Sequence, residues 1–136
     1  MLFGRGENSI YATKHRLLPH AAGVELEEVI GDIINQTKVD AVFASRRPAL
    51  VFHAAAHKHV PMMEANAFEA VKNNVFGTRR LGRLAGEFGV AAFVLISTDK
   101  AVRPTSVMGA TKRVAELVVQ DLDKEYATRF VAVRFG

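Results

Sequence analysis

Residues 97–116, STDKAVRPTSVMGATKRVAE, bring together side chains that could carry out acid–base chemistry. Asp99 and Lys100 are adjacent and follow a continuous apolar run. An aspartate and a lysine beside a cleft serve as acid and base only when their surroundings shift both protonation equilibria. Neighbouring side chains on a regular strand face opposite ways, so the chain must turn here for both to reach one ligand. Without a ligand, the pair is a strand-end turn with two exposed charges.

Lys112 lies four positions after Met108, so the two side chains share a face if this part of the segment is helical. The Lys112 ammonium can donate hydrogen bonds to a ligand. The Met108 thioether is only a weak acceptor and does not titrate. The segment therefore combines an acid, a base and a second lysine with Met108, whose side chain cannot take a proton from a substrate hydroxyl.

The elements that must position these residues follow from an alternation of short apolar runs with longer amphipathic ones, which predicts an α/β fold. We expect strands at residues 26–33, 49–56, 91–99 and 129–136, and the end of a further strand at residues 1–4. We expect helices at residues 36–45, 64–88 and 106–127.

The run at 91–99 is apolar almost throughout, which is typical of a strand buried on both faces of a parallel sheet. The pattern therefore predicts a doubly wound parallel sheet with helices on both faces. We expect one sheet to contain residues 49–53, 91–96 and 130–135.

The glycine pattern bears on domain organisation. A doubly wound nucleotide-binding fold places G-x-G-x-x-G after its first strand, whereas this sequence offers only GRG at residues 4–6. We therefore interpret residues 1–136 as part of one NAD(P)-binding Rossmann-like domain, without its first βα unit and without a C-terminal substrate domain. The alternative is that the chain binds no dinucleotide.

Small or polar residues recur where the predicted strands end, and open parallel sheets bind ligands at that edge. Arg5 follows the first strand, Asp32 ends the second, and the third runs into Ala54, Ala55 and Ala56. The alanines let a flat nucleotide approach the backbone. An arginine at the position of Arg5 can accommodate a 2′-phosphate, which favours NADP, but the nearby Glu7 keeps NAD open. Taken singly, Asp32 could cap a helix and the alanines could serve packing.

His53 belongs to the third expected strand, and His57 and His59 follow in the loop. No carboxylate pattern accompanies the three histidines, so we expect no metal site. Lys58 in the same loop could meet a diphosphate, and it could equally be a solvated loop lysine.

Composition excludes several classes of function. The net charge is +4 and the pI about 9.7, but the basic residues are scattered and form no block with interleaved aromatics, so we expect no nucleic-acid partner. The sequence contains no cysteine, signal peptide or apolar run long enough to cross a membrane. These features fit a reducing compartment, and we expect a cytoplasmic protein.

Three stretches carry a resemblance to a known family: residues 51–78, residues 97–116 and VRFG at residues 133–136. Together they resemble the extended short-chain dehydrogenase/reductases. Within that superfamily, the match is to nucleotide-sugar 4,6-dehydratases of the polysaccharide-biosynthesis branch, of the capsular and flagellin-glycosylation type.

The resemblance implies that NAD(P)⁺ oxidises the sugar at C4, that water is lost across C5 and C6, and that a 4-keto-6-deoxy sugar nucleotide results. Thr98 would bind the C4 oxygen, Asp99 would be the acid at C6 and Lys100 the base at C5. Lys112 would hold the nicotinamide ribose. Asp32 and Ile33 would flank the adenine. The remaining site residues implied are Asn74, which would frame the active site, and Lys58, Val60 and Pro61 on the substrate side.

Met108 departs from the Tyr-x₃-Lys pattern of most of the superfamily. Either the site is inactive, or the chain resembles a long subtype in which methionine replaces tyrosine and turnover persists. Retention of Thr98, Asp99, Lys100 and Lys112 favours the second interpretation. That subtype carries membrane helices ahead of its catalytic part, so the whole protein is expected to be anchored in a membrane. We also expect a homo-oligomer. The alternatives are a sugar-nucleotide 4-epimerase, or a dinucleotide-binding sensor or scaffold without turnover.

Overall fold

The computed structural model describes all of residues 1–136 as five strands and six α-helices joined by short turns. The strands are Leu2–Gly4 (β1), Glu28–Ile30 (β2), Leu50–His53 (β3), Ala92–Thr98 (β4) and Arg129–Phe135 (β5). The α-helices are Glu7–Leu17 (α1), Gln36–Arg46 (α2), Val60–Ala65 (α3), Ala67–Val71 (α4), Thr78–Glu87 (α5) and Val107–Glu125 (α6). A π-helical turn spans Lys72–Gly77, and 3₁₀ turns span Leu18–His20 and Asp99–Ala101.

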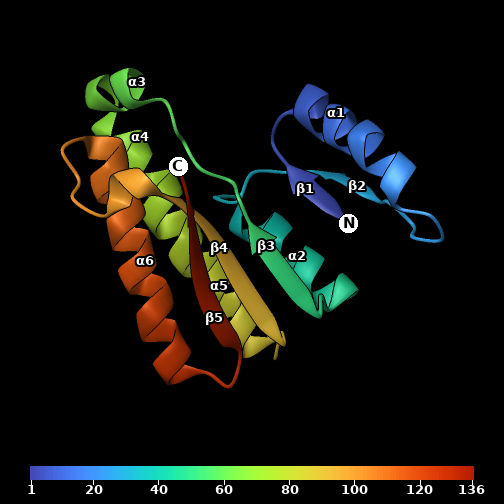
Figure 1. Cartoon of the computed structure of the whole chain (residues 1–136). Coiled ribbons are helices and arrows are strands. Elements are labelled where there is room, and N and C mark those ends of the chain that lie inside the picture. The colour runs from blue at the N-terminus through green and yellow to red at the C-terminus, as the bar shows by residue number, and fades with distance from the viewer.

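The strands form two parallel sheets (Figure 1). β1 pairs with β2, and β3, β4 and β5 form a three-stranded sheet in that order. In the larger sheet, Phe93 of β4 lies opposite Val51 of β3 and Phe130 of β5. This pairing confirms that residues 49–53, 91–96 and 130–135 share one parallel sheet. Two strands are shorter than expected, because residues 26–33 contribute only β2 and residues 49–56 pair only as far as His53.

The main core lies between the strands and a layer formed by α2, α5 and α6 (Figure 1). Phe93 and Leu95 of β4 are completely buried there. α1 covers the other face of the small sheet, since a side chain at Gly4 would come within 3.0 Å of Ile10 in α1. The large sheet differs on this second face, where Leu50 and Phe52 of β3 are 58 % and 70 % exposed.

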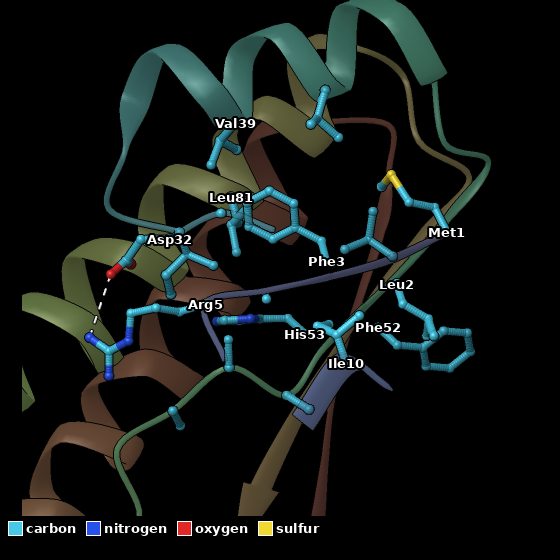
Figure 2. Close-up of a pocket in the computed structure, with 18 of the residues that line it drawn as sticks. Met1, Leu2, Phe3, Arg5, Ile10, Asp32, Val39, Phe52, His53 and Leu81 are labelled. Atoms are coloured by element: carbon cyan, nitrogen blue, oxygen red, sulfur yellow. Dashed lines mark ion pairs between the residues drawn. The ribbon is translucent and has the colours of Figure 1, made fainter. Parts of the chain in front are cut away.

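Each of β1 and β3 pairs with one neighbour only, so each strand has an unpaired edge. A cavity of about 680 Å³ lies between them and is lined by residues of both strands (Figure 2). Apolar side chains such as Leu2, Phe3 and Phe52 line it along the strands, and Arg5 and Asp32 lie at the carboxyl end. The gap between the sheets therefore has an apolar body and a polar end.

The helix predicted at 64–88 begins earlier and is interrupted. Pro61 lies in the first turn of α3, where the missing N–H costs nothing. Asn66 has φ −135° and ψ 49°, which is not helical, so α3 ends there and α4 follows. The π-helical turn then leads directly into α5. The apolar periodicity continues through these interruptions, so the sequence pattern alone predicts a single helix.

α1 is an element that the sequence patterns did not predict. Only Ile10 of this helix is buried, so the apolar periodicity that signals an amphipathic helix is weak. Residues 7–17 form a regular helix that directly follows the GRG segment.

Candidate active site

A tight turn at the end of β4 gathers the predicted acid and base. The Thr98 hydroxyl accepts from the Lys100 backbone N–H at 3.4 Å and caps the 3₁₀ turn Asp99–Ala101. Thr98 Oγ1 also donates to Asp99 Oδ1 at 2.9 Å, and Lys100 Nζ donates to the same oxygen at 3.2 Å. The chain thus turns where the sequence required it to, and both charged side chains remain exposed.

The charge state of Asp99 follows from these contacts. The hydrogen bond from Thr98, followed by the one from Lys100, lowers the pKa of the Asp99 carboxyl below its ordinary value. Asp99 is therefore ionised at neutral pH in this structure. A group that is to donate a proton to a leaving hydroxyl must first acquire one.

Met108 lies in the first turn of α6 and is buried, packed in a small apolar cluster with Met63 and Ala70. Gly109 next to it permits a close approach, because a Cβ there would lie 2.6 Å from the Lys100 carbonyl oxygen. The start of α6 is thereby pressed against the turn that holds Asp99 and Lys100. Met108 contributes packing at this contact.

Lys112 is one helical turn further along α6 and only 5 % exposed. Its Nζ donates to the Ile96 carbonyl oxygen of β4 at 2.7 Å. Burial lowers the Lys112 pKa, and the negative charge of Glu116 opposes that shift. The contact fixes the ammonium directly beside the strand that ends in Thr98.

A buried ionic cluster behind the turn was not anticipated. The Glu116 carboxylate of α6 is 2 % exposed and accepts from the Ser97 hydroxyl at 2.6 Å. Arg134 of β5 donates to it twice, at 2.9 and 2.8 Å, and Arg113 donates at 3.1 Å. The bond from Arg134 is the largest cause that lowers the Glu116 pKa to about 2. The sequence feature that could have indicated this cluster is Glu116, an acidic residue on the otherwise apolar face of the helix expected at residues 106–127.

Both the oxygen and the nitrogen of the Asn74 side-chain amide form hydrogen bonds to other residues of the protein. Asn74 Oδ1 accepts from the His57 N–H at 2.8 Å, and Asn74 Nδ2 donates to the His57 carbonyl at 3.0 Å and to Thr111 at 3.1 Å. With 1 % exposure, it joins the loop after β3 to α6. In this arrangement Asn74 positions the loop and has no free hydrogen-bonding group for a ligand.

His53 at the end of β3 does not form a metal site with His57 and His59 of the following loop, and the structure contains no group of three possible metal-binding side chains. His53 is buried, with Nε2 at 2.9 Å from the Thr78 hydroxyl. Thr78 donates its hydrogen to the Asn74 carbonyl, so it accepts from His53, whose Nε2 carries the proton. Burial and the charge of Lys112 lower the His53 pKa to about 3, which keeps the ring neutral.

The residues expected on the cofactor side meet around the polar end of the cavity. Arg5 forms an ion pair with Asp32, with Nη1 and Oδ2 3.5 Å apart (Figure 2). Asp32 Oδ1 also accepts from the Ile34 N–H at 3.0 Å, and Ile33 packs in the main core. The cavity is further lined by three exposed or half-buried alanines, Ala54, Ala55 and Ala56.

The residues expected on the substrate side lie at the start of α3. Lys58 and Pro61 are exposed, and Val60 is half-buried against the cluster that contains Met108. They are near in sequence to the loop that Asn74 holds. Of the three, only Val60 packs on the cluster between α3 and α6, and Lys58 precedes α3.

Parallel strands with polar groups at their carboxyl ends define this chain as a Rossmann-like α/β protein. The family model described as "Polysaccharide biosynthesis protein" matches residues 1–136, and the chain belongs to that family.

Curated relatives and solved structures agree with this assignment. The chain is 51 % identical to the capsular polysaccharide biosynthesis protein CapD of Staphylococcus aureus, covering 100 % of this chain and 23 % of CapD. It is 36 % identical to a UDP-N-acetylglucosamine 4,6-dehydratase (inverting) of Campylobacter jejuni, covering 79 % of this chain and 32 % of that protein. The structure of Pen from Bacillus thuringiensis superimposes with a TM-score of 0.84 at 34 % identity, covering 98 % of this chain and 41 % of Pen.

The chain spans about a quarter of the length of the first curated relatives it matches, at 23 % each. None of its helices is both long enough and apolar enough to pass through a membrane.

Proposed function

We propose that this chain supplies dinucleotide-binding and catalytic residues of a nucleotide-sugar 4,6-dehydratase that converts a UDP-N-acetylglucosamine-type substrate into a 4-keto-6-deoxy sugar for polysaccharide synthesis. The observation that carries the proposal is the turn that gathers Thr98, Asp99 and Lys100 within hydrogen-bonding distance beside Lys112. The relationship to a UDP-N-acetylglucosamine 4,6-dehydratase supports the choice of substrate class.

The residues present fit the adenosine half of a dinucleotide. The Asp32 carboxylate and the Arg5 guanidinium can bind ribose or adenine groups, and the small side chains of residues 54–56 leave the backbone open. NAD or NADP would supply the site with a reversible hydride acceptor. Lys112 would hold the nicotinamide ribose from its fixed place beside Ile96.

The gap between the sheets supports the same proposal. One further parallel strand between β1 and β3 would give the order β2-β1-X-β3-β4-β5, which is the order of the dinucleotide-binding fold when renumbered. The glycine-rich phosphate turn of that fold follows such a strand. We propose that this element occupies the cavity in the whole protein.

Within the site, each residue has a separate task. Thr98 binds the C4 hydroxyl, Lys100 removes the C5 proton and Asp99 protonates the departing C6 hydroxyl. Asp99 and Lys100 are exposed at the strand end and Thr98 is half-buried beside them, so a sugar can reach this turn. We further propose a cytoplasmic homo-oligomer, which in the whole protein is anchored to the membrane by a segment outside this chain.

A 4-epimerase is the second candidate, because UDP-glucose 4-epimerases of Rickettsia are also related, one of them 42 % identical over 92 residues. An epimerase inverts C4 and has no use for an acid and a base aimed at C5 and C6. The adjacent Asp99 and Lys100 therefore favour the dehydratase.

Mass spectrometry of the whole protein incubated with NAD⁺ and UDP-N-acetylglucosamine tests the proposal. A dehydratase yields a product lighter by one water, whereas an epimerase leaves the mass unchanged. Cofactor binding without any sugar conversion would support the sensor or scaffold and overturn the dehydratase.

A further inference from the structure

We infer that Glu64 is a positioning residue of the candidate site. Its carboxylate holds the first turn of α6 against α3, and through that turn it fixes the substrate-side residues relative to the helix that carries Lys112. The inference rests on the proposed function, and it adds to the site a residue that lies outside the turn at the end of β4.

The contact joins two elements that are far apart in the sequence. Glu64 Oε1 in α3 accepts from the backbone N–H of Val107, the first residue of α6, at 2.7 Å and across 43 residues. The first N–H groups of a helix have no carbonyl partner within that helix. The Ser106 hydroxyl serves the Gly109 N–H at 3.1 Å, so the Val107 N–H depends on Glu64. The helix dipole also favours a carboxylate at this end of α6.

The Glu64 side chain has no second partner in the protein. It takes part in no ion pair, and its bond to Val107 is the one hydrogen bond between α3 and α6. The nearby Glu69 of α4 differs, because its carboxylate pairs with Lys72 on the surface at 3.9 Å. The Glu64 carboxylate is thus committed to the start of α6.

The first turn of α6 contacts two parts of the candidate site. Met108 packs on Met63 of α3 in a small buried cluster. Gly109 lies against the backbone of Lys100, since a Cβ at this glycine would come within 2.6 Å of the Lys100 carbonyl oxygen. Lys112 follows one turn further along the same helix. A displacement of the first turn is therefore transmitted to both lysines.

The apolar cluster alone leaves this turn some freedom. It contains three buried residues, Met63, Ala70 and Met108. Methionine side chains are unbranched and adapt to their surroundings, so such a cluster tolerates small displacements. A hydrogen bond has a preferred distance and direction. Glu64 therefore supplies the directional contact that the cluster lacks.

Glu64 also fixes the end of the segment that carries the substrate-side residues. At the beginning of this segment, two hydrogen bonds of 2.8 and 3.0 Å join His57 to Asn74. At its end, Glu64 is bound to the start of α6. Lys58 and Pro61 lie exposed between these two contacts. The substrate-side segment and α6 are thus held in one arrangement from both ends of the segment.

Turnover of the whole protein with saturating NAD⁺ and UDP-N-acetylglucosamine tests the inference, at a temperature where circular dichroism shows every variant to be folded. Glu64→Ala removes the cap and should lower kcat by about 5–30-fold, the equilibrium factor that one helix cap represents. Glu64→Gln keeps an oxygen that can accept from Val107, so it should retain most of the turnover. The matched control is Glu69→Ala on α4, which should turn over like the unmodified protein.

Hydrogen exchange of the Val107 amide gives a readout without cofactor. Exchange should be faster in Glu64→Ala and unchanged in Glu64→Gln, and unchanged exchange in Glu64→Ala would refute the contact itself. Faster exchange together with an unchanged kcat would limit Glu64 to local stability and overturn the inference. An equal loss of kcat in Glu64→Ala and Glu64→Gln would also overturn it, because the charge and not the cap would then be responsible. A lack of sugar conversion by the unmodified protein would instead refute the proposed function, and the inference with it.

Discussion

The Arg134 guanidinium of β5 forms two hydrogen bonds to the Glu116 carboxylate of α6, at 2.9 and 2.8 Å, from positions 18 residues apart in the sequence. Ser97 at the end of β4 donates to the same carboxylate. This contact fixes α6, which carries Met108 and Lys112, against the strand that ends in Thr98. The ion pair is therefore a structural support for the candidate site.

The ion pair predicts a pH-dependent stability. Glu116 has a pKa of about 2 in the folded protein against an ordinary 4.5, so its contribution is present above pH 4.5 and is lost as the pH falls towards 2. Linkage puts this contribution at about 3 kcal/mol. Urea unfolding at several pH values should show it. In Glu116→Gln the stability should change less over this range, whereas Asp121→Asn, at an exposed pair, should behave like the unmodified protein. Equal pH dependence in Glu116→Gln would contradict the assignment.

Met108 should matter for packing more than for chemistry. Met108→Ala should destabilise the fold by about 2 kcal/mol, at the low end for a buried methionine because its cluster is small. Met108→Leu conserves volume and should cost below about 1.5 kcal/mol. Thermal unfolding measures both effects. Turnover of Met108→Leu should stay close to that of the unmodified protein, and a loss as large as in Lys100→Ala would give Met108 a chemical role.

Lys100→Ala should stop the reaction after oxidation at C4. Without the base, the C5 proton stays in place, so a 4-keto hexose with an intact C6 hydroxyl accumulates beside reduced cofactor. Deuterium exchange at C5, followed by mass spectrometry, should fall by about 10²–10⁴-fold. Unimpaired exchange would remove Lys100 from the role of base.

Lys112 should act at an earlier step. Lys112→Met retains much of the apolar stem but loses the ammonium that Ile96 holds, so cofactor binding and nicotinamide reduction should both weaken. Calorimetric titration with NAD⁺ or NADP⁺ measures the first effect. The matched control is Lys124→Met, at the exposed end of the same helix. If binding were unaffected in Lys112→Met, the ribose contact would be wrong.

The 136-residue chain by itself should bind the cofactor weakly and should self-associate. Unpaired edges at β1 and β3 can template further strands, and Leu50 and Phe52 expose apolar surface beside one of them. Sedimentation velocity should show oligomers that diminish in Phe52→Ser. Phe68→Ser serves as the control, since Phe68 is 76 % exposed on α4 away from that edge. Sub-micromolar NADP affinity, or a strictly monomeric chain, would contradict this expectation.

The sequence by itself determined the strands of the large sheet, their parallel direction and the need for a turn at Asp99 and Lys100. Apolar runs of strand length and the helical periods between them are local signals. They predict the observed elements because each strand or helix forms by burying its own apolar face. The interrupted helix after Pro61 and the missed α1 mark the limit of that signal. The helix ends at Asn66 although the apolar periodicity continues past it. α1 has only one buried residue, Ile10, and therefore shows no clear apolar periodicity.

Only the tertiary structure decided how the site residues are used. Met108 could have faced a ligand, and it is buried because Met63 and Ala70 from α3 and α4 pack on it. Asn74 could have bound a ligand, and its amide is consumed by His57 and Thr111. These partners lie between 17 and 37 residues away from Asn74 along the chain. Such contacts depend on where separate elements meet in space, and a pattern that repeats every two or 3.6 residues contains no information about that meeting.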